Sequence, residues 1–313
     1  MNAALRQKVK AITASTDIGV SFSVKNCREY GIDWELALAD TLALGFKRFR
    51  LMSYWDEHEP EQGVRDFSVL KRQINNIMNS GGRVTLCLGM RQPRWPETHI
   101  PAWAKILTPE ETAAAYLDYQ HAVIEAFKGE QSIESWQLEN EFWLKTFGEH
   151  FDFSRDRLKK EFDQIRQLDP ERPIIMSLSD TLWLPLRSPK PDIYATSVYR
   201  NIYSNGTYIT TKTKPWYYKV RKMIINTLCR RDFIIHELQT EPWGPQANWL
   251  MSDEEQAKSM NAEQVNAALT YAHKTGIGYI DIWGAEWWFW RKTARNDTSL
   301  VAVLQDIHPK NIA

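Results

Sequence analysis

The stretch Ser135-Trp-Gln-Leu-Glu-Asn-Glu-Phe-Trp-Leu144 places two carboxylates and an amide directly after an apolar run that is typical of a short buried strand. Glu139, Asn140 and Glu141 thus stand where a protein core favours Val or Leu. Burying an unpaired carboxylate costs several kcal/mol unless a partner or a function retains it. We therefore take Glu141 as the first candidate catalytic residue.

Strand-like and helix-like segments alternate on both sides of this stretch. The other predicted strands are Asp17–Ser23, Phe46–Leu51, Arg83–Gly89, Pro173–Leu178, Ile193–Tyr199, Asp232–Glu237 and Gly278–Trp283. The predicted helices are Trp34–Leu44, Phe67–Ser80, Pro109–Lys128, Arg155–Leu168, a short turn near Leu182, Trp216–Leu228 and Asp253–Lys274. This alternation implies a parallel sheet with crossover helices. At 313 residues, a closed (β/α)₈ TIM barrel is the economical solution, and an open doubly wound sheet is the alternative.

The bulk composition predicts one α/β domain over residues 1–313, with a short N-terminal extension at 1–15. Lys+Arg equals Asp+Glu at 39 each, so we expect neither a nucleic-acid nor a membrane partner. Three scattered cysteines fit a reducing compartment, and no apolar signal segment opens the chain. We expect a cytoplasmic protein, although a chain that had lost an export signal would look the same. The oligomeric state is not indicated.

A second carboxylate ends a strand in Phe233-Ile-Ile-His-Glu-Leu-Gln-Thr-Glu-Pro-Trp-Gly244. In a closed barrel, Glu237 and Glu141 would face each other across a narrow mouth. Repulsion across such a gap raises the pKa of one carboxyl, which then serves as an acid while the other stays ionised as a nucleophile. Glu241 is the alternative nucleophile, but it precedes Pro242 in what should be loop.

Aromatic residues follow several of the predicted strands. Trp55, Trp95, Trp243 and Trp283 are the candidates for stacking on a sugar, because a flat ring suits the C–H face of a pyranose. Glu286 is predicted either to bind a sugar hydroxyl or to pair with Arg291. The seven histidines show no HExxH pair, and no glycine-rich phosphate loop is present. We therefore expect no metal and no cofactor.

These motifs resemble those of clan A glycoside hydrolases, the large group of retaining (β/α)₈ enzymes. Gln137-Leu-Glu-Asn-Glu141 is similar to the strand-four signature of the group, and His236-Glu-Leu-Gln239 to its nucleophile region. The resemblance implies that Glu141 is the acid/base, Glu237 the nucleophile and Asn140 a ligand of the sugar 2-hydroxyl. It also implies that Arg50 supports the nucleophile, Tyr199 orients it, and Trp283 forms a floor under the cleaved sugar.

The predicted function is a glycosidase that hydrolyses a β-linked oligo- or polysaccharide with retention, by double displacement with two glutamates. A non-catalytic glycan-binding TIM barrel is the alternative. A barrel lyase or isomerase is a third reading, which would require a cofactor, metal or phosphate site. The identity of the sugar, and the choice between internal and terminal cleavage, are not indicated by the residues.

Overall fold

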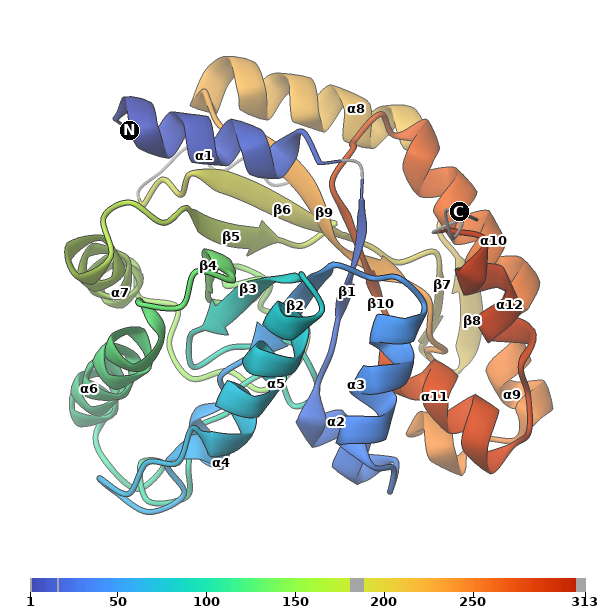
Figure 1. The fold of residues 1–313 in the computed structure, drawn as a ribbon, viewed down its shortest axis with the longest axis horizontal. Coiled ribbons are helices and arrows are strands. Elements are labelled where there is room, and N and C mark those ends of the chain that lie inside the picture. The colour runs from blue at the N-terminus through green and yellow to red at the C-terminus, as the bar shows by residue number, and fades with distance from the viewer. Residues whose placement is uncertain (1, 16, 181–188, 308–313) are drawn as a thin grey trace.

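Eight parallel strands close into one barrel with helices around it (Figure 1). The structure is a computed structural model that describes residues 2–15, 17–180 and 189–307. The barrel strands are β1 (Ile18–Ser21), β2 (Arg48–Met52), β3 (Arg83–Leu88), β4 (Ile133–Leu138), β5 (Ile174–Leu178), β6 (Ile193–Val198), β9 (Asp232–Gln239) and β10 (Ile280–Trp283). The predicted (β/α)₈ fold is confirmed. The open sheet is excluded, because β1 pairs with both β2 and β10.

Helices cover the outside of the barrel. They are α2 (Val24–Glu29), α3 (Trp34–Ala43), α4 (Trp55–His58), α5 (Ser68–Asn79), α6 (Pro109–Phe127), α7 (Arg155–Leu168), α8 (Pro215–Ile224), α9 (Asp253–Ala257), α10 (Ala262–Lys274), α11 (Ala285–Ala294) and α12 (Ser299–Gln305). None of the helices in the described part of the chain is both long and apolar enough to cross a bilayer.

Local capping explains where the helices differ from the prediction. The helix expected over 253–274 is two helices, because the Asn261 side chain accepts a hydrogen bond from the Gln264 amide at 3.0 Å and starts α10 afresh. Helix α8 continues as a π-helical turn over Ile225–Cys229, ended by Arg230 in a left-handed conformation. The turn expected near Leu182 lies outside the described residues.

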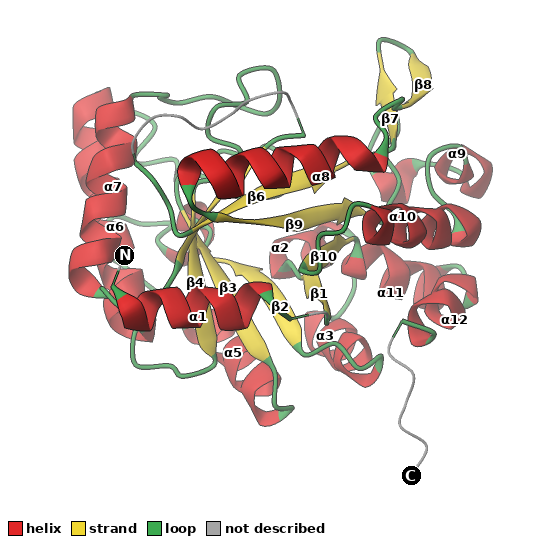
Figure 2. Ribbon diagram, turned by 90° about the horizontal axis from the view of Figure 1, so that it is seen from above, coloured by secondary structure: helices red, strands yellow, loops and turns green. Residues whose placement is uncertain are grey.

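The N-terminal segment forms a helix, α1 (Ala3–Thr13), that packs against the end of the barrel where the strands begin. Val9 and Ile12 on its buried face belong to one apolar cluster with Ile175, Ile193, Ala195, Ile234 and Tyr279. Figure 2 shows α1 crossing the barrel at this end. A functional site is therefore expected at the opposite end of the barrel, where the strands finish.

A small hairpin stands at that opposite end, between β6 and α8 (Figure 2). Strands β7 (Asn201–Ser204) and β8 (Thr207–Thr210) pair antiparallel around Asn205-Gly206, both with positive φ, as a tight two-residue hairpin turn requires. The Gln239 side chain accepts hydrogen bonds from the Arg200 and Asn201 amides at 2.9 and 3.0 Å. These bonds tie the hairpin to the end of β9.

Candidate active site

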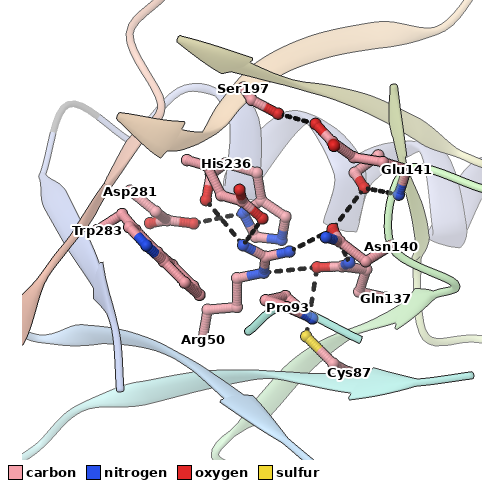
Figure 3. A network of polar contacts seen from close by, with 12 residues as sticks. Arg50, Cys87, Pro93, Gln137, Asn140, Glu141, Ser197, His236, Asp281 and Trp283 are labelled. Atoms are coloured by element: carbon pink, nitrogen blue, oxygen red, sulfur yellow. Dashed lines mark hydrogen bonds and ion pairs between the residues drawn. The ribbon is translucent and has the colours of Figure 1, made fainter. Parts of the chain in front are cut away.

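Arg50 is the centre of a buried polar network at the mouth of the barrel (Figure 3). It lies on β2, and its guanidinium donates from Nε to Gln137 Oε1 at 2.6 Å and from Nη2 to Asn140 Oδ1 at 3.0 Å. Nη1 donates to Glu237 Oε1 at 2.7 Å. Burial alone would lower the pKa of Arg50, but the charge of Glu237 raises it above its ordinary value. The guanidinium therefore stays charged and fixes a carboxylate at the end of β9.

Glu237 has a second partner on the neighbouring strand. The Tyr199 hydroxyl, which follows β6, donates to Glu237 Oε2 at 3.2 Å. Each carboxylate oxygen of Glu237 thus accepts one hydrogen bond, one from Arg50 and one from Tyr199. This arrangement holds the Glu237 carboxylate in one orientation.

Glu141 lies just beyond β4 in a different environment. The Ser197 hydroxyl, on β6, donates to Glu141 Oε1. Burial first, and then the charge of Glu237, raise the pKa of Glu141 to about 8. Glu237 is thus paired with an arginine, whereas Glu141 is kept protonated near neutral pH, and acid and nucleophile roles need such a difference between two carboxyls.

Glu139 is separated from Glu141 by the backbone. Both residues adopt positive φ, 46° and 44°, so the chain turns sharply as it leaves β4. The Glu139 carboxylate accepts from the Met90 and Arg91 amides, each at 3.1 Å, and from Arg157 Nη1 at 2.7 Å. Because α7 supplies Arg157, Glu139 faces the helix layer and not the barrel mouth.

Asn140 and Glu97 form a link that the sequence analysis only partly anticipated. Asn140 Nδ2 donates to Glu97 Oε2 at 3.0 Å, and Asn140 Oδ1 accepts from Ser177 Oγ at 2.8 Å as well as from Arg50. Burial raises the pKa of Glu97 to about 7, although Arg91 opposes the shift. Glu97 was missed because it lies in the irregular segment after β3, where no periodic pattern marks a side chain as inward-facing.

A second charged cluster lies beside the first. Arg94 donates from Nη1 to Glu241 Oε1 and from Nη2 to Glu286 Oε2, each at 2.5 Å. Its guanidinium lies 4.0 Å from the centre of the Trp283 ring, and Trp283 Nε1 donates to Glu241 Oε1 at 2.8 Å. Glu241 thus has a partner set of its own and lacks the Arg50 and Tyr199 contacts that hold Glu237.

The barrel that carries these clusters is found in solved glycosidases. A β-galactosidase from Halorubrum lacusprofundi matches 85% of this chain with a TM-score of 0.59 at 14% identity, and the chain spans 52% of that protein. A GH5_18 structure from Streptomyces cattleya, in complex with GlcNAc, matches 86% of this chain and 70% of its own, with a TM-score of 0.60 at 14% identity. The fold is shared with clan A glycoside hydrolases.

A third solved glycosidase shares the barrel. A β-glucosidase from Exiguobacterium marinum matches 82% of this chain and 77% of its own, with a TM-score of 0.53 at 12% identity. No protein-family model matches the sequence, and no curated protein is significantly similar to it. At these identities the likeness concerns the fold alone.

A row of contacting aromatic rings extends from Tyr199, the hydrogen-bond partner of Glu237, to the solvent. Tyr199 contacts Trp243 with ring centres 5.2 Å apart, Trp243 contacts Phe147 at 5.2 Å, and Phe147 contacts Trp95 at 5.8 Å. Trp95 is 65% exposed at the outer end of this row. Trp95 and Trp243, both expected at the site, therefore lie in one continuous rim, and Phe147 is a member that the sequence did not reveal.

The prediction for Trp55 is wrong. This residue begins α4 directly after β2, and the helix turns its ring into the outer shell, where it is fully buried. The ring packs against Trp103, Tyr116 and Tyr119 with centres 5.5 to 5.9 Å apart. Its Nε1 donates to Glu59 Oε2 at 3.1 Å. A sugar cannot reach it.

The prediction for Glu286 also needs correction. Its carboxylate is fully buried and pairs with Arg94, whereas Arg291 pairs with Asp253 and Asp297. The Arg291 alternative is wrong, and burial leaves no exposed oxygen for a direct contact with a sugar hydroxyl. Within the described ranges, no group of three or more His, Cys, Asp or Glu side chains could hold a metal ion.

Proposed function

We propose that the protein is a retaining β-glycosidase, with Glu237 as nucleophile and Glu141 as acid/base. The observation that carries this proposal is the electrostatic asymmetry of the two carboxyls at the barrel mouth. Glu237 is fixed by Arg50 and Tyr199, whereas Glu141 has a pKa raised to about 8 by burial and by the charge of Glu237. Two carboxyls in these opposite states are what glycoside hydrolysis with retention requires.

The first step forms a covalent glycosyl-enzyme. A carboxylate oxygen of Glu237 attacks the anomeric carbon while the bond from that carbon to the leaving oxygen breaks. Glu141 transfers its proton to the leaving oxygen, so that an alcohol departs and Glu141 becomes a carboxylate. Arg50 and Tyr199 keep the attacking carboxylate oriented, and Ser197 stabilises the charge that appears on Glu141.

The second step returns both glutamates to their starting states. With Glu237 esterified, its negative charge is gone, and the pKa of Glu141 falls because one of the causes that raised it is removed. Glu141 can then take a proton from water, which attacks the anomeric carbon and releases Glu237 as a carboxylate. The anomeric carbon is inverted twice, so the product keeps the β configuration.

The substrate class proposed is a neutral β-linked oligo- or polysaccharide. The aromatic rim of Trp95, Phe147, Trp243 and Tyr199 provides several flat faces in a row, more than one sugar ring needs. The four rim side chains are uncharged, which favours uncharged sugars over acidic ones. The neighbouring Arg94 is already matched by two carboxylates.

The decisive experiment separates Glu237 from Glu241 by trapping the intermediate. Aryl 2-deoxy-2-fluoro-β-glycosides of glucose, galactose, mannose and xylose are incubated with the protein, because the fluorine slows the release of the glycosyl-enzyme. Proteolysis and mass spectrometry then locate the added sugar. We expect the label on Glu237 and a parallel loss of the aryl glycosidase activity found for the same sugar.

Two variants sharpen this test. Glu237→Ala should abolish labelling, while Glu241→Gln should keep it, since Glu241 belongs to the Arg94 cluster. A label on Glu241 would contradict the role given to Glu237. Binding of β-glucan, mannan, xylan or galactan by calorimetry, with no cleavage of any aryl glycoside or polymer, would instead support a glycan-binding barrel.

A further inference from the structure

Helix α8 presents apolar side chains to the solvent as well as to the barrel. Trp216 is 64% exposed, Val220 38% and Met223 60%, and their spacing of four and three residues places them on one face of the helix. Leu228, in the π-helical turn that continues α8, is 65% exposed. Tyr218 and Ile225 fill the opposite, buried face. We call the four exposed residues the α8 stripe.

The chain segment that carries the α8 stripe is rich in positive charge. From Asp192 to Asp232 the chain contains eight lysines and arginines and no acidic residue between these two aspartates. Lys212, Lys214, Lys219 and Arg230 are the exposed members of this set. None of these four takes part in a salt bridge within the described part of the chain. The equal totals of acidic and basic residues over the whole protein therefore conceal a strongly basic segment.

The α8 stripe lies away from the catalytic glutamates. Figure 2 shows α8 running along the flank of the barrel beside β6 and β9, on its outer surface. The β7–β8 hairpin stands beyond one end of the helix, and its Ile209 is 42% exposed. A flat surface placed against α8 would lie along the flank of the barrel. It would not cover the barrel mouth, where the proposed active site lies.

We propose that the α8 stripe binds the surface of an anionic lipid bilayer. Interfacial helices combine an apolar face that enters the headgroup region with lysines and arginines that contact anionic lipids, and tryptophan is favoured at that depth. The charge of the stripe's surroundings complements such a surface. The balanced total charge led us to expect no membrane partner. A membrane, however, contacts one face of a protein, so the charge of that face matters more than the total.

Two other partners fit the same face less well. A nucleic acid would use the lysines and could stack on Trp216, but Val220, Met223 and Leu228 are aliphatic and offer no ring to a base. A second copy of this chain would bring two basic faces together, and like charges across a contact oppose association. Of these three partners, only a lipid surface uses the apolar and the basic residues together.

Vesicle flotation tests the proposal with the full-length protein. Vesicles of phosphatidylcholine alone are compared with vesicles that also contain phosphatidylglycerol, at low and high salt. We expect flotation with the anionic vesicles, weakened by salt. Each of Lys212, Lys214 and Lys219 replaced by Gln should weaken binding about fivefold, since a lysine near an anionic surface contributes about 1 kcal/mol.

The apolar part of the stripe has a closely matched control. Trp216→Ala should reduce flotation, whereas Trp95→Ala, which removes a ring of almost equal exposure at the barrel mouth, should leave flotation unchanged. Circular dichroism verifies that each variant is folded. Loss of binding in both tryptophan variants alike would overturn the assignment to α8.

Three results would overturn the proposal as a whole. They are equal recovery with neutral and anionic vesicles, no flotation in either, and retention of the protein by single-stranded nucleic acid that competes with vesicles. A dimer that dissociates in Trp216→Ala, seen by ultracentrifugation, would assign the stripe to a second copy. Hydrolysis of soluble aryl glycosides is measured separately, so either proposal can fail without the other.

Discussion

Arg50 Nη1 lies 2.7 Å from Glu237 Oε1, and the guanidinium that makes this contact is fully buried. The same guanidinium also donates to Gln137 on β4 and to Asn140 just beyond β4. Nη1 also donates to the His236 carbonyl oxygen at 3.2 Å, so four acceptors together satisfy the buried charge. Arg50 therefore determines the orientation of the carboxylate proposed as nucleophile.

Arg50→Lys should lower kcat/KM for aryl glycosides by about 10² to 10³, the usual cost of losing a preorganised hydrogen-bond donor in an active site. Lysine keeps the positive charge but cannot reach Glu237, Gln137 and Asn140 together. Arg72→Lys is the control, because Arg72 is 57% exposed on α5 and should tolerate the change. A loss of only a few-fold in Arg50→Lys would show that charge alone suffices.

The pH dependence of kcat/KM should have an alkaline limb near pH 8, falling about tenfold per pH unit above it. Glu141 must carry a proton in the first step, its pKa is raised to about 8, and the proton is lost as the pH rises through that value. In Glu141→Ala, a dinitrophenyl glycoside needs no acid, so the limb should vanish. A limb that survives in this variant and disappears in Glu97→Gln would assign the proton to Glu97.

Trp95→Ala should raise KM for oligosaccharides by about tenfold and leave kcat for a short aryl glycoside nearly unchanged, because Trp95 lies at the outer end of the aromatic rim and far from the reacting bond. Trp216→Ala is matched in exposure and should alter neither constant. Steady-state kinetics on a substrate series of increasing length provides the measurement. A fall in kcat for the aryl glycoside in Trp95→Ala would place this ring nearer to the chemistry.

Arg157→Leu should lower the free energy of unfolding by about 3–5 kcal/mol at neutral pH, since it leaves Glu139 and Glu161 buried without their shared cation. Burial already raises the pKa of Glu161, and loss of Arg157, which opposes that shift, should raise it further. A carboxyl whose pKa is higher in the folded than in the unfolded state destabilises the folded state as the pH rises through the folded-state value. The loss of unfolding free energy should therefore be smaller at about pH 4.

Urea unfolding of this variant at both pH values checks the expectation. Arg72→Leu removes an exposed arginine and its surface ion pair with Glu35, and should change stability by less than about 1 kcal/mol. An equal loss in both variants would mean that the Glu139 site is not a buried charge network. A loss that does not depend on pH would remove the two glutamates from the explanation.

The sequence predicted the barrel because its signal is periodic. Most strands are short, largely buried and rich in apolar residues, and the crossover helices have apolar residues at helical spacing, so the alternation is visible without contacts. Where one helix ends and another begins depends on single caps, and Asn261 divides a segment that looked continuous. Glu141 and Glu237 were found because a carboxylate at a strand end interrupts an apolar pattern.

The remaining site residues depend on contacts between loops, which leave no pattern in the sequence. Arg94 and Glu97 lie in the irregular segment after β3, and only the folded chain brings them to Glu241 and Asn140. The prediction for Trp55 failed for a different reason. It follows a strand, as the rim residues do, yet α4 starts at once and turns its ring into the shell.

The Arg50 network has a consequence for the order of folding. Its contacts join residues 87, 90 and 187 positions apart in the chain, on β2, β4 and β9. Contacts of such long sequence separation form late, because the entropy of closing the intervening chain must be overcome first. A refolding chain should therefore gain helical signal before it gains turnover, and the appearance of catalysis should report the moment at which the sheet closes on itself.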